Sequence, residues 1–303
     1  MSKISIESKE IFAGQDHLYL IFQDAAGQEF VIRSGPENNN PLDFGDIVAA
    51  VNVPIAESED ARGNNTPAER GNRELDLGGR AAEDVWEIMK QQATNINNAG
   101  IDYDIFISAQ NSNSTIASVL NSIGIAVASN IPLNTEANDL PGVSNLLTLD
   151  TTLIGTPAND IISGYVGNDI LLGNNGDDSL RGNSGNDVID GELGNDFLSG
   201  DLGNDILKAG FGQDILNGGA GNDIFGFYAL GHHKVQDFIL TEDQIFFDSV
   251  KTGLSNIDAV NQAITAVIQR DDGVTVEFGP DASVDLIGIN FADITADMVG
   301  FAS

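Results

Sequence analysis

The chain has 303 residues, with 46 acidic and 13 basic residues, and a formal net charge of −33 at pH 7. Such acidity argues against nucleic acids and anionic membranes as partners, because both repel negative charge. The sequence contains no cysteine, which excludes disulfides and thiol chemistry. No apolar run approaches the ~20 residues of a membrane span.

The first 150 residues predict an α+β domain. HLYLIF (17–22) and QEFVIRSG (28–35) flank a short polar turn and predict a β-hairpin. ELDLGG (74–79) predicts a strand that ends in a turn. The segment 36–73, rich in Asn, Pro, Gly and charge, is predicted to be a long surface loop or lid.

Two helices are predicted next. Apolar residues at helical spacing mark residues 80–96 and the second half of 110–124, which begins as an Asn/Ser-rich segment. A strand that carries His17, followed by a helix whose N-terminus has Ser112 after Asn111, resembles the permuted papain-like hydrolases (NlpC/P60 and lecithin-retinol acyltransferase-like). In those enzymes a strand histidine activates a cysteine at a helix N-terminus.

The resemblance covers about 100 residues and two short patches, and this chain has serine where the family has cysteine. It implies that His17 is the general base and Ser112 the nucleophile, with the helix N-terminus stabilising an oxyanion. Ser114 is a competing nucleophile. The alternative is that these serines simply cap the helix, since Ser and Asn are preferred there.

From Gly155 to Gly226 the chain repeats every nine residues, eight times without a break. Position one is Gly in seven units, as is position four, and position eight is always a large apolar residue. Position six is always aspartate, at Asp160, Asp169, Asp178, Asp187, Asp196, Asp205, Asp214 and Asp223. A short fixed period predicts a solenoid in which each unit buries its apolar side chain against its neighbours.

The spacing also predicts a metal site. Glycine allows sharp turns through positive φ, and the aspartates supply hard oxygen ligands, which suit Ca²⁺. The three residues after each aspartate form a short strand, so two units make one turn of a right-handed parallel coil. Loops two units apart then stack, and the gaps between eight loops give about six calcium sites by this count.

The units resemble the RTX (repeats-in-toxin) nonapeptide GGxGxDxUx, a Ca²⁺-binding β-roll motif. They depart from it at position two in most units, and at Ala158 and Ala209, so the first and seventh units are predicted to be the weaker sites. The resemblance implies a secreted, extracellular protein that leaves the cell through a type I secretion machinery and folds outside. The N-terminal segment lacks the apolar core of a cleaved secretory signal, which agrees with that route.

KVQDFILTEDQIFFDSV (234–250) resembles the segment that commonly follows RTX repeats. A helix is predicted over 255–269 with Ser255 as N-cap, then strands over 274–278 and 283–289 that cap the solenoid. His232 and His233 are predicted to be surface residues. The prediction is thus a multidomain protein: an α+β domain (1–150), an RTX β-roll (151–229) and a small β-rich cap with the secretion signal (230–303).

Overall fold

A computed structural model describes residues 1–12, 15–36, 47–54, 71–99, 112–125, 150–229 and 231–302. The chain forms two compact units, residues 1–149 and residues 150–303. The element bounds in the first unit are β1 (Lys3–Phe12), β2 (Gln15–Gln23), β3 (Glu29–Pro36), β4 (Ile47–Pro54), β5 (Gly71–Glu74), α1 (Ala82–Ala99) and α2 (Ser112–Asn121).

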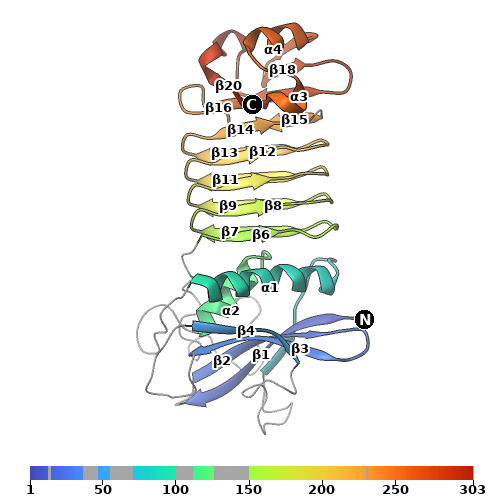
Figure 1. The fold of residues 1–303 in the computed structure, drawn as a ribbon, viewed down its shortest axis with the longest axis vertical. Coiled ribbons are helices and arrows are strands. Elements are labelled where there is room, and N and C mark those ends of the chain that lie inside the picture. Colours follow the sequence, from blue (N-terminus) through green and yellow to red (C-terminus); the bar gives the residue numbers. More distant parts are fainter. Residues whose placement is uncertain are drawn as a thin grey trace. The chain divides into compact units, whose positions relative to one another are not determined.

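The first unit is an antiparallel sheet in the order β4-β3-β2-β1-β5, with α1 and α2 on one face (Figure 1). Strands alternate their side chains between two faces, so Phe22 of β2 points toward the helices. Its ring stacks on that of Trp86 of α1 at 5.6 Å between centroids. The apolar stripe of α1 is therefore buried against the sheet, with Val85 and Met89 fully buried.

The predicted hairpin and both predicted helices of this unit are present as β2–β3, α1 and α2. Two predictions were wrong in part. The strand predicted at 74–79 lies earlier, because β5 ends at Glu74 where its pairing with β1 ends. The segment 36–73, predicted to be a loop, contains β4, which pairs with β3.

The repeats form a parallel solenoid. Its strands alternate between two sheets, and residues 18 apart are paired, for example Ile189 with Leu207 and Leu198 with Leu216 (Figure 1). The strands are β6 (Thr152–Ile154), β7 (Ile161–Val166), β8 (Ile170–Leu172), β9 (Ser179–Ser184), β10 (Val188–Asp190), β11 (Phe197–Leu202), β12 (Ile206–Lys208), β13 (Ile215–Ala220) and β14 (Ile224–Phe227). The prediction of two units per turn is confirmed.

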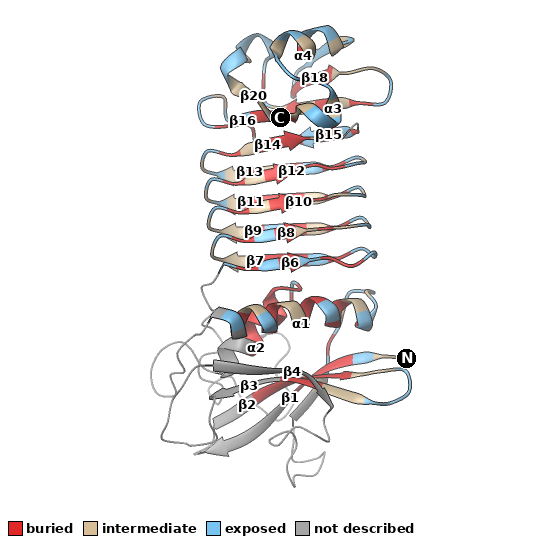
Figure 2. Cartoon of the chain, in the orientation of Figure 1, coloured by how far each residue is buried: buried red, intermediate tan, exposed pale blue. Residues whose placement is uncertain are grey.

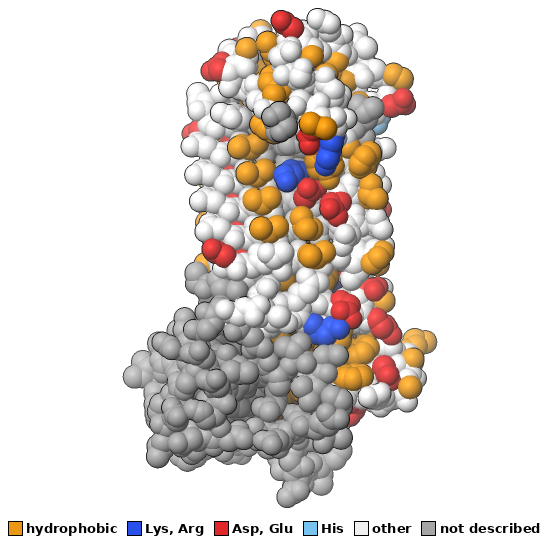
Figure 3. All heavy atoms as spheres, viewed as in Figure 1, with side chains coloured by type: hydrophobic (Ala, Val, Ile, Leu, Met, Phe, Trp, Pro, Cys, Tyr) orange, Lys and Arg blue, Asp and Glu red, His pale blue; other side chains and the backbone are white. Residues whose placement is uncertain are grey.

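The core of the roll is the row of position-eight residues, and buried positions recur along its strands, in red in Figure 2. All eight are 0 % exposed: Ile162, Leu171, Leu180, Ile189, Leu198, Leu207, Leu216 and Phe225. Complete burial of such a side chain is worth about 1.5–3 kcal/mol. Positions seven and nine point outward, so apolar residues such as Ile154 and Ile170 remain exposed. Figure 3 shows apolar side chains, in orange, along one face of the roll.

The C-terminal segment continues both sheets. Its elements are β15 (His232–Val235), β16 (Gln244–Asp248), α3 (Ser249–Thr252), α4 (Ile257–Ala263), β17 (Ala266–Arg270), β18 (Gly273–Glu277), β19 (Ser283–Ile287), η4 (Phe291–Asp293), η5 (Ala296–Met298) and β20 (Val299–Ala302). Strands β15 and β19 extend one sheet of the roll, while β16 and β20 extend the other. The open end of the solenoid is therefore covered, as predicted.

The predicted helix 255–269 is half helix and half strand. Helix α4 ends at Ala263 and its N-cap is Asn256, whose side chain accepts from the Ala259 amide. The remainder is β17, which pairs with β18 through positions such as Val267 and Ile268. Pairing with a neighbouring strand outweighed the helical spacing, and the β-branched residues favour that outcome.

Among the helices that the structure describes, none has the length and apolar character needed to cross a bilayer.

Candidate metal centre

The position-six aspartates are buried in two stacks, one for each side of the roll. Their exposed fraction is between 0 % and 3 % in all eight units. One carboxylate oxygen accepts the backbone N–H of the aspartate 18 residues earlier: Asp187 Oδ1 accepts from Asp169 N at 2.7 Å, and Asp196 Oδ1 from Asp178 N at 2.9 Å. This ladder fixes each carboxylate between consecutive loops of its stack.

The other oxygen is left without a hydrogen-bond partner in the central units. These oxygens are Oδ2 of Asp169, Asp178, Asp187, Asp196 and Asp205. Oδ2 of Asp214, in the seventh unit, has no hydrogen-bond partner either. A buried acceptor without a partner costs about 1–3 kcal/mol, and more when it is charged. These oxygens lie in two stacks, and a hard cation that prefers oxygen would supply the positive charge that an ionised carboxylate lacks there.

Burial perturbs the acidity of these groups. Loss of solvation raises the pKa of Asp178, Asp187 and Asp196 to about 7, and stacked carboxylates raise it further. The pKa of Asp223 is raised to about 6 for the same first reason. Without a cation, the roll therefore holds aspartates that resist ionisation near neutral pH.

Positions one and four favour glycine for two separate steric reasons. A Cβ on Gly182, at position one, would overlap the carboxylate of Asp187 in the same unit. A Cβ on Gly203, at position four, would overlap the carbonyl of Gly185 in the loop below. The glycines thus bring carbonyl oxygens and the carboxylate close to the same gap, where they can act together as ligands.

Position two is glycine in the motif but another residue in most units of this chain. In the second to sixth units its residues have positive φ although they are not glycine: Tyr165 (86°), Asn174 (68°), Asn183 (77°), Glu192 (63°) and Asp201 (72°). Thr156 of the first unit does not share this conformation. Asparagine and aspartate tolerate this left-handed region, whereas tyrosine and glutamate do so at a cost. The loop geometry is therefore kept although the preferred residue is absent.

Position five carries a second ladder, which the sequence prediction missed. Asn168 Oδ1 accepts from Asn186 N at 2.8 Å, and Asn186 Oδ1 accepts from Asn204 N at 2.7 Å. The other stack repeats the pattern: Asn195 Oδ1, for instance, accepts from Gln213 N at 2.9 Å. The signal was visible in the sequence, because position five is Asn, Asp or Gln in every unit.

The donor set fits calcium. Within the described ranges, no group of three or more His, Cys, Asp or Glu side chains forms a metal cluster. The ligands available in each gap are thus a carboxylate oxygen and the carbonyls of the glycine turns, which are hard oxygen donors of the kind that Ca²⁺ takes.

Comparison with known proteins agrees with this geometry. Residues 148–180, 172–207 and 190–225 match the family model of the RTX calcium-binding nonapeptide repeat. Residues 148–225 are RTX calcium-binding nonapeptide repeats. Such repeats bind Ca²⁺, as predicted. No curated protein matches the chain.

Similar solved structures include two subunits of the mannuronan C5-epimerase of Azotobacter vinelandii. AlgE6R2 is 22 % identical over 52 % of this chain and 94 % of its own length, with a TM-score of 0.34. AlgE6R3 is 26 % identical over 50 % and 78 %, with a TM-score of 0.26. The extracellular lipase LipA of Serratia marcescens is 17 % identical over 51 % and 38 %, with a TM-score of 0.24.

The candidate catalytic residues of the first unit lie on the predicted elements. His17 is on β2, opposite Lys9 of β1, and Ser112 is the first residue of α2. The side chains of both residues lie outside the described part of the chain. Their meeting as base and nucleophile stays a prediction.

Proposed function

We propose that residues 150–303 are a folding module that becomes ordered when Ca²⁺ binds, in a protein that acts outside the cell. The carrying observation is the row of buried, partnerless Oδ2 atoms in Asp169, Asp178, Asp187, Asp196 and Asp205. A bound cation supplies the charge that these oxygens lack, and binding then contributes directly to the free energy of folding.

Charge balance supports the same proposal. Residues 151–303 hold 24 acidic and five basic residues, so the metal-free chain repels itself strongly. The chain also has no cysteine, so no disulfide can stabilise the fold after export. Calcium takes over this stabilising role in the proposal.

The calcium affinity expected for such a module supports an extracellular location. Extracellular calcium modules bind at roughly 10⁻⁴–10⁻³ M, well above the concentration at which cytosolic sites fill. The chain would therefore stay unfolded inside the cell, pass a type I secretion machinery and fold on arrival. Co-expression of the full chain with such an exporter should place it in the medium, and deletion of residues 230–303 should abolish this. Equal export of the truncated chain would contradict the predicted position of the signal.

The calcium step is tested by far-UV circular dichroism of the full chain after chelation. Titration with Ca²⁺ should give a cooperative gain of β signal, and Mg²⁺ at the same concentration should not. A double Asp187→Asn/Asp205→Asn variant removes two partnerless oxygens of one stack and should shift the midpoint upward. Asp177→Asn is the control, because this exposed position-five residue lies outside the position-six ladder. No spectral response to millimolar Ca²⁺ would refute the module.

A second candidate function is hydrolysis of an ester or amide by the first unit. The supporting observation is that Ser112 begins α2, and α2 packs against β2, which carries His17. A helix N-terminus lowers the energy of an oxyanion near it. A serine-directed phosphonate should then label the chain, and both Ser112→Ala and His17→Ala should abolish labelling. Ser114→Ala is the matched control, and loss of labelling only in that variant would move the nucleophile by two residues.

A further inference from the structure

Both aspartate stacks continue past the last repeat, but with different residues. Ile215 pairs with Lys234, so the residue that follows Asp214 in its stack is His233. On the other side Ile224 pairs with Gln244, which places Asp243 after Asp223. One stack thus ends in a histidine and the other in an aspartate.

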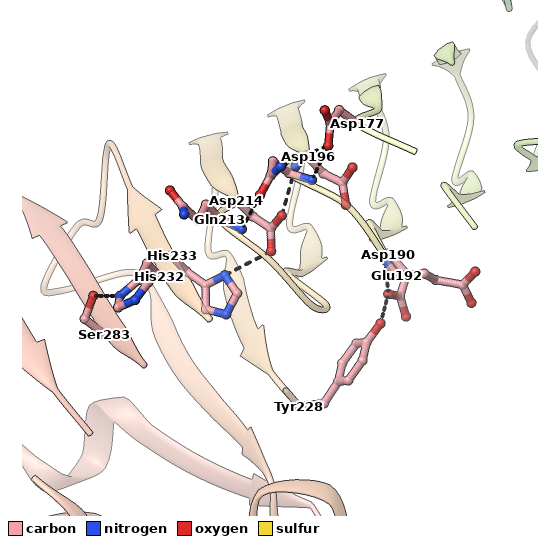
Figure 4. Close-up of polar contacts among 11 residues, drawn as sticks. Asp177, Asp190, Glu192, Asp196, Gln213, Asp214, Tyr228, His232, His233 and Ser283 are labelled. Atoms are coloured by element: carbon pink, nitrogen blue, oxygen red, sulfur yellow. Dashed lines mark hydrogen bonds and ion pairs between the residues drawn. The ribbon is translucent and has the colours of Figure 1, made fainter. Parts of the chain in front are cut away.

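His233 contacts the oxygen that the central units leave without a partner. Its Nδ1 lies 2.9 Å from Asp214 Oδ2, and the two side chains are 2 % and 0 % exposed (Figure 4). The contact is a close approach and not a linear hydrogen bond, and the imidazole nitrogen occupies the space next to Oδ2. The prediction of a surface histidine holds for His232 and is wrong for His233.

The surroundings hold the imidazole in this position. The ring of Phe227 stacks on it, with centroids 5.4 Å apart and planes 30° apart. The seventh unit also has Ala209 where other units have glycine at position one. In those units, a Cβ at that place would overlap the carboxylate of the same unit, as Gly182 shows with Asp187. The Cβ of Ala209 therefore removes room beside Asp214.

The last carboxylate of the other stack has hydrogen bonds to both of its oxygens. Asp243 Oδ1 accepts from Asp223 N at 2.9 Å, and its Oδ2 accepts from Ile239 N at 2.8 Å. Both carboxylate oxygens are thus satisfied by backbone amides, unlike those of Asp187 or Asp205.

We propose that His233 takes the place of a calcium ion at the end of its stack, so that Asp214 is not a calcium ligand through Oδ2. The last turn of the roll is then joined to the C-terminal cap by protein contacts alone. This inference rests on the proposed calcium binding and refines it, because it removes one of the eight aspartates that were predicted to be ligands. The cap end of the roll can form before calcium arrives and serve as a template for the remaining turns.

Native mass spectrometry of the full chain in Ca²⁺ tests this by counting bound ions. His233→Asp restores the aspartate ladder, and it should bind one ion more than the wild type. His232→Asp is the matched control: it adds the same charge at the exposed neighbouring residue, and should leave the count unchanged. An unchanged count in folded His233→Asp would overturn the proposal.

A second pair of variants decides the matter if His233→Asp does not fold. Asp196→Asn removes a partnerless oxygen and should lower the ion count by at least one. Asp214→Asn is the same change one loop further along the same stack, and it should keep the wild-type count. Equal losses in the two variants would overturn the role of His233. A wild-type chain that binds no calcium would refute the proposed function itself, so the two failures can be told apart.

Discussion

Tyr165 has a backbone conformation that favours glycine. Its φ is 86°, and Gly210 and Gly219 occupy the same position of their units with φ of 89° and 100°. A residue with a Cβ pays for this conformation with about 1–2 kcal/mol. This conformational cost belongs to Tyr165 alone, because the backbone hydrogen bonds of the loop do not involve its side chain.

We therefore expect Tyr165→Gly to be more stable than Tyr165→Ala by about 1 kcal/mol. Both variants lose the aromatic ring, so their difference isolates the backbone term. Urea unfolding of the calcium-bound chain, followed by circular dichroism, measures it. Equal midpoints would mean that the left-handed conformation is not strained here.

Gly203 is sensitive to substitution for a different reason. A Cβ at this position would overlap the carbonyl oxygen of Gly185 in the stacked loop. Gly203→Ala forces two stacked loops apart and is expected to destabilise the roll by about 3 kcal/mol. Gly226→Ala is the control, because its nearest neighbour is the flexible Lys208 side chain at 3.3 Å. Thermal unfolding in calcium should show a large loss only for Gly203→Ala, and similar losses would contradict close loop contact.

At the scale of the element, a loop depends on the loops that stack on it. Asp187 lies in the middle of its stack and has a partnerless Oδ2. The first unit differs: Asp160 Oδ2 accepts from Thr156 N at 2.6 Å and from Thr156 Oγ1 at 2.9 Å. Part of its carboxylate is thus satisfied by the protein, and terminal units of a solenoid contribute less to stability.

Asp187→Asn should consequently raise the Ca²⁺ concentration at the folding midpoint more than Asp160→Asn does. A circular dichroism titration of each full-length variant provides the comparison. Indistinguishable midpoints for the two variants would speak against calcium in the central gaps.

At the scale of the whole molecule, protons and calcium compete for the same carboxylates. In the metal-free fold the pKa of Asp178, Asp187 and Asp196 is about 7, against 3.8 as the ordinary value. Between these values the folded state binds more protons than the unfolded state, so its stability falls as the pH rises. The stabilisation by protons is complete below about pH 3.8 and is lost as the pH passes about 7.

In the presence of a chelator, the chain should therefore show more β structure at pH 5 than at pH 8. The apparent affinity for Ca²⁺ should change in the opposite direction, because each proton must leave before an ion binds. A triple variant, Asp178→Asn/Asp187→Asn/Asp196→Asn, is expected to lose most of the pH response. Less β structure at pH 5 than at pH 8 in the wild type would contradict the sign.

The sequence by itself determined the solenoid, its period, its buried row and its aspartate stacks. The reason is repetition. The pattern that contains Asp196 and Leu198 recurs eight times, so the same turn, ligand and buried position are predicted independently in every unit. The position-five ladder can also be predicted from the sequence, because position five is Asn, Asp or Gln in every unit, as at Asn168 and Asn186.

Only the tertiary structure decided what happens where the repetition ends. The register that places His233 after Asp214 contains one extra residue, since Ile215 pairs with Lys234, 19 residues later and not 18. The strand character of Val267 and Ile268 depends on pairing with β18. Both outcomes depend on contacts between segments far apart in the chain, and spacing within one segment carries no information about such contacts.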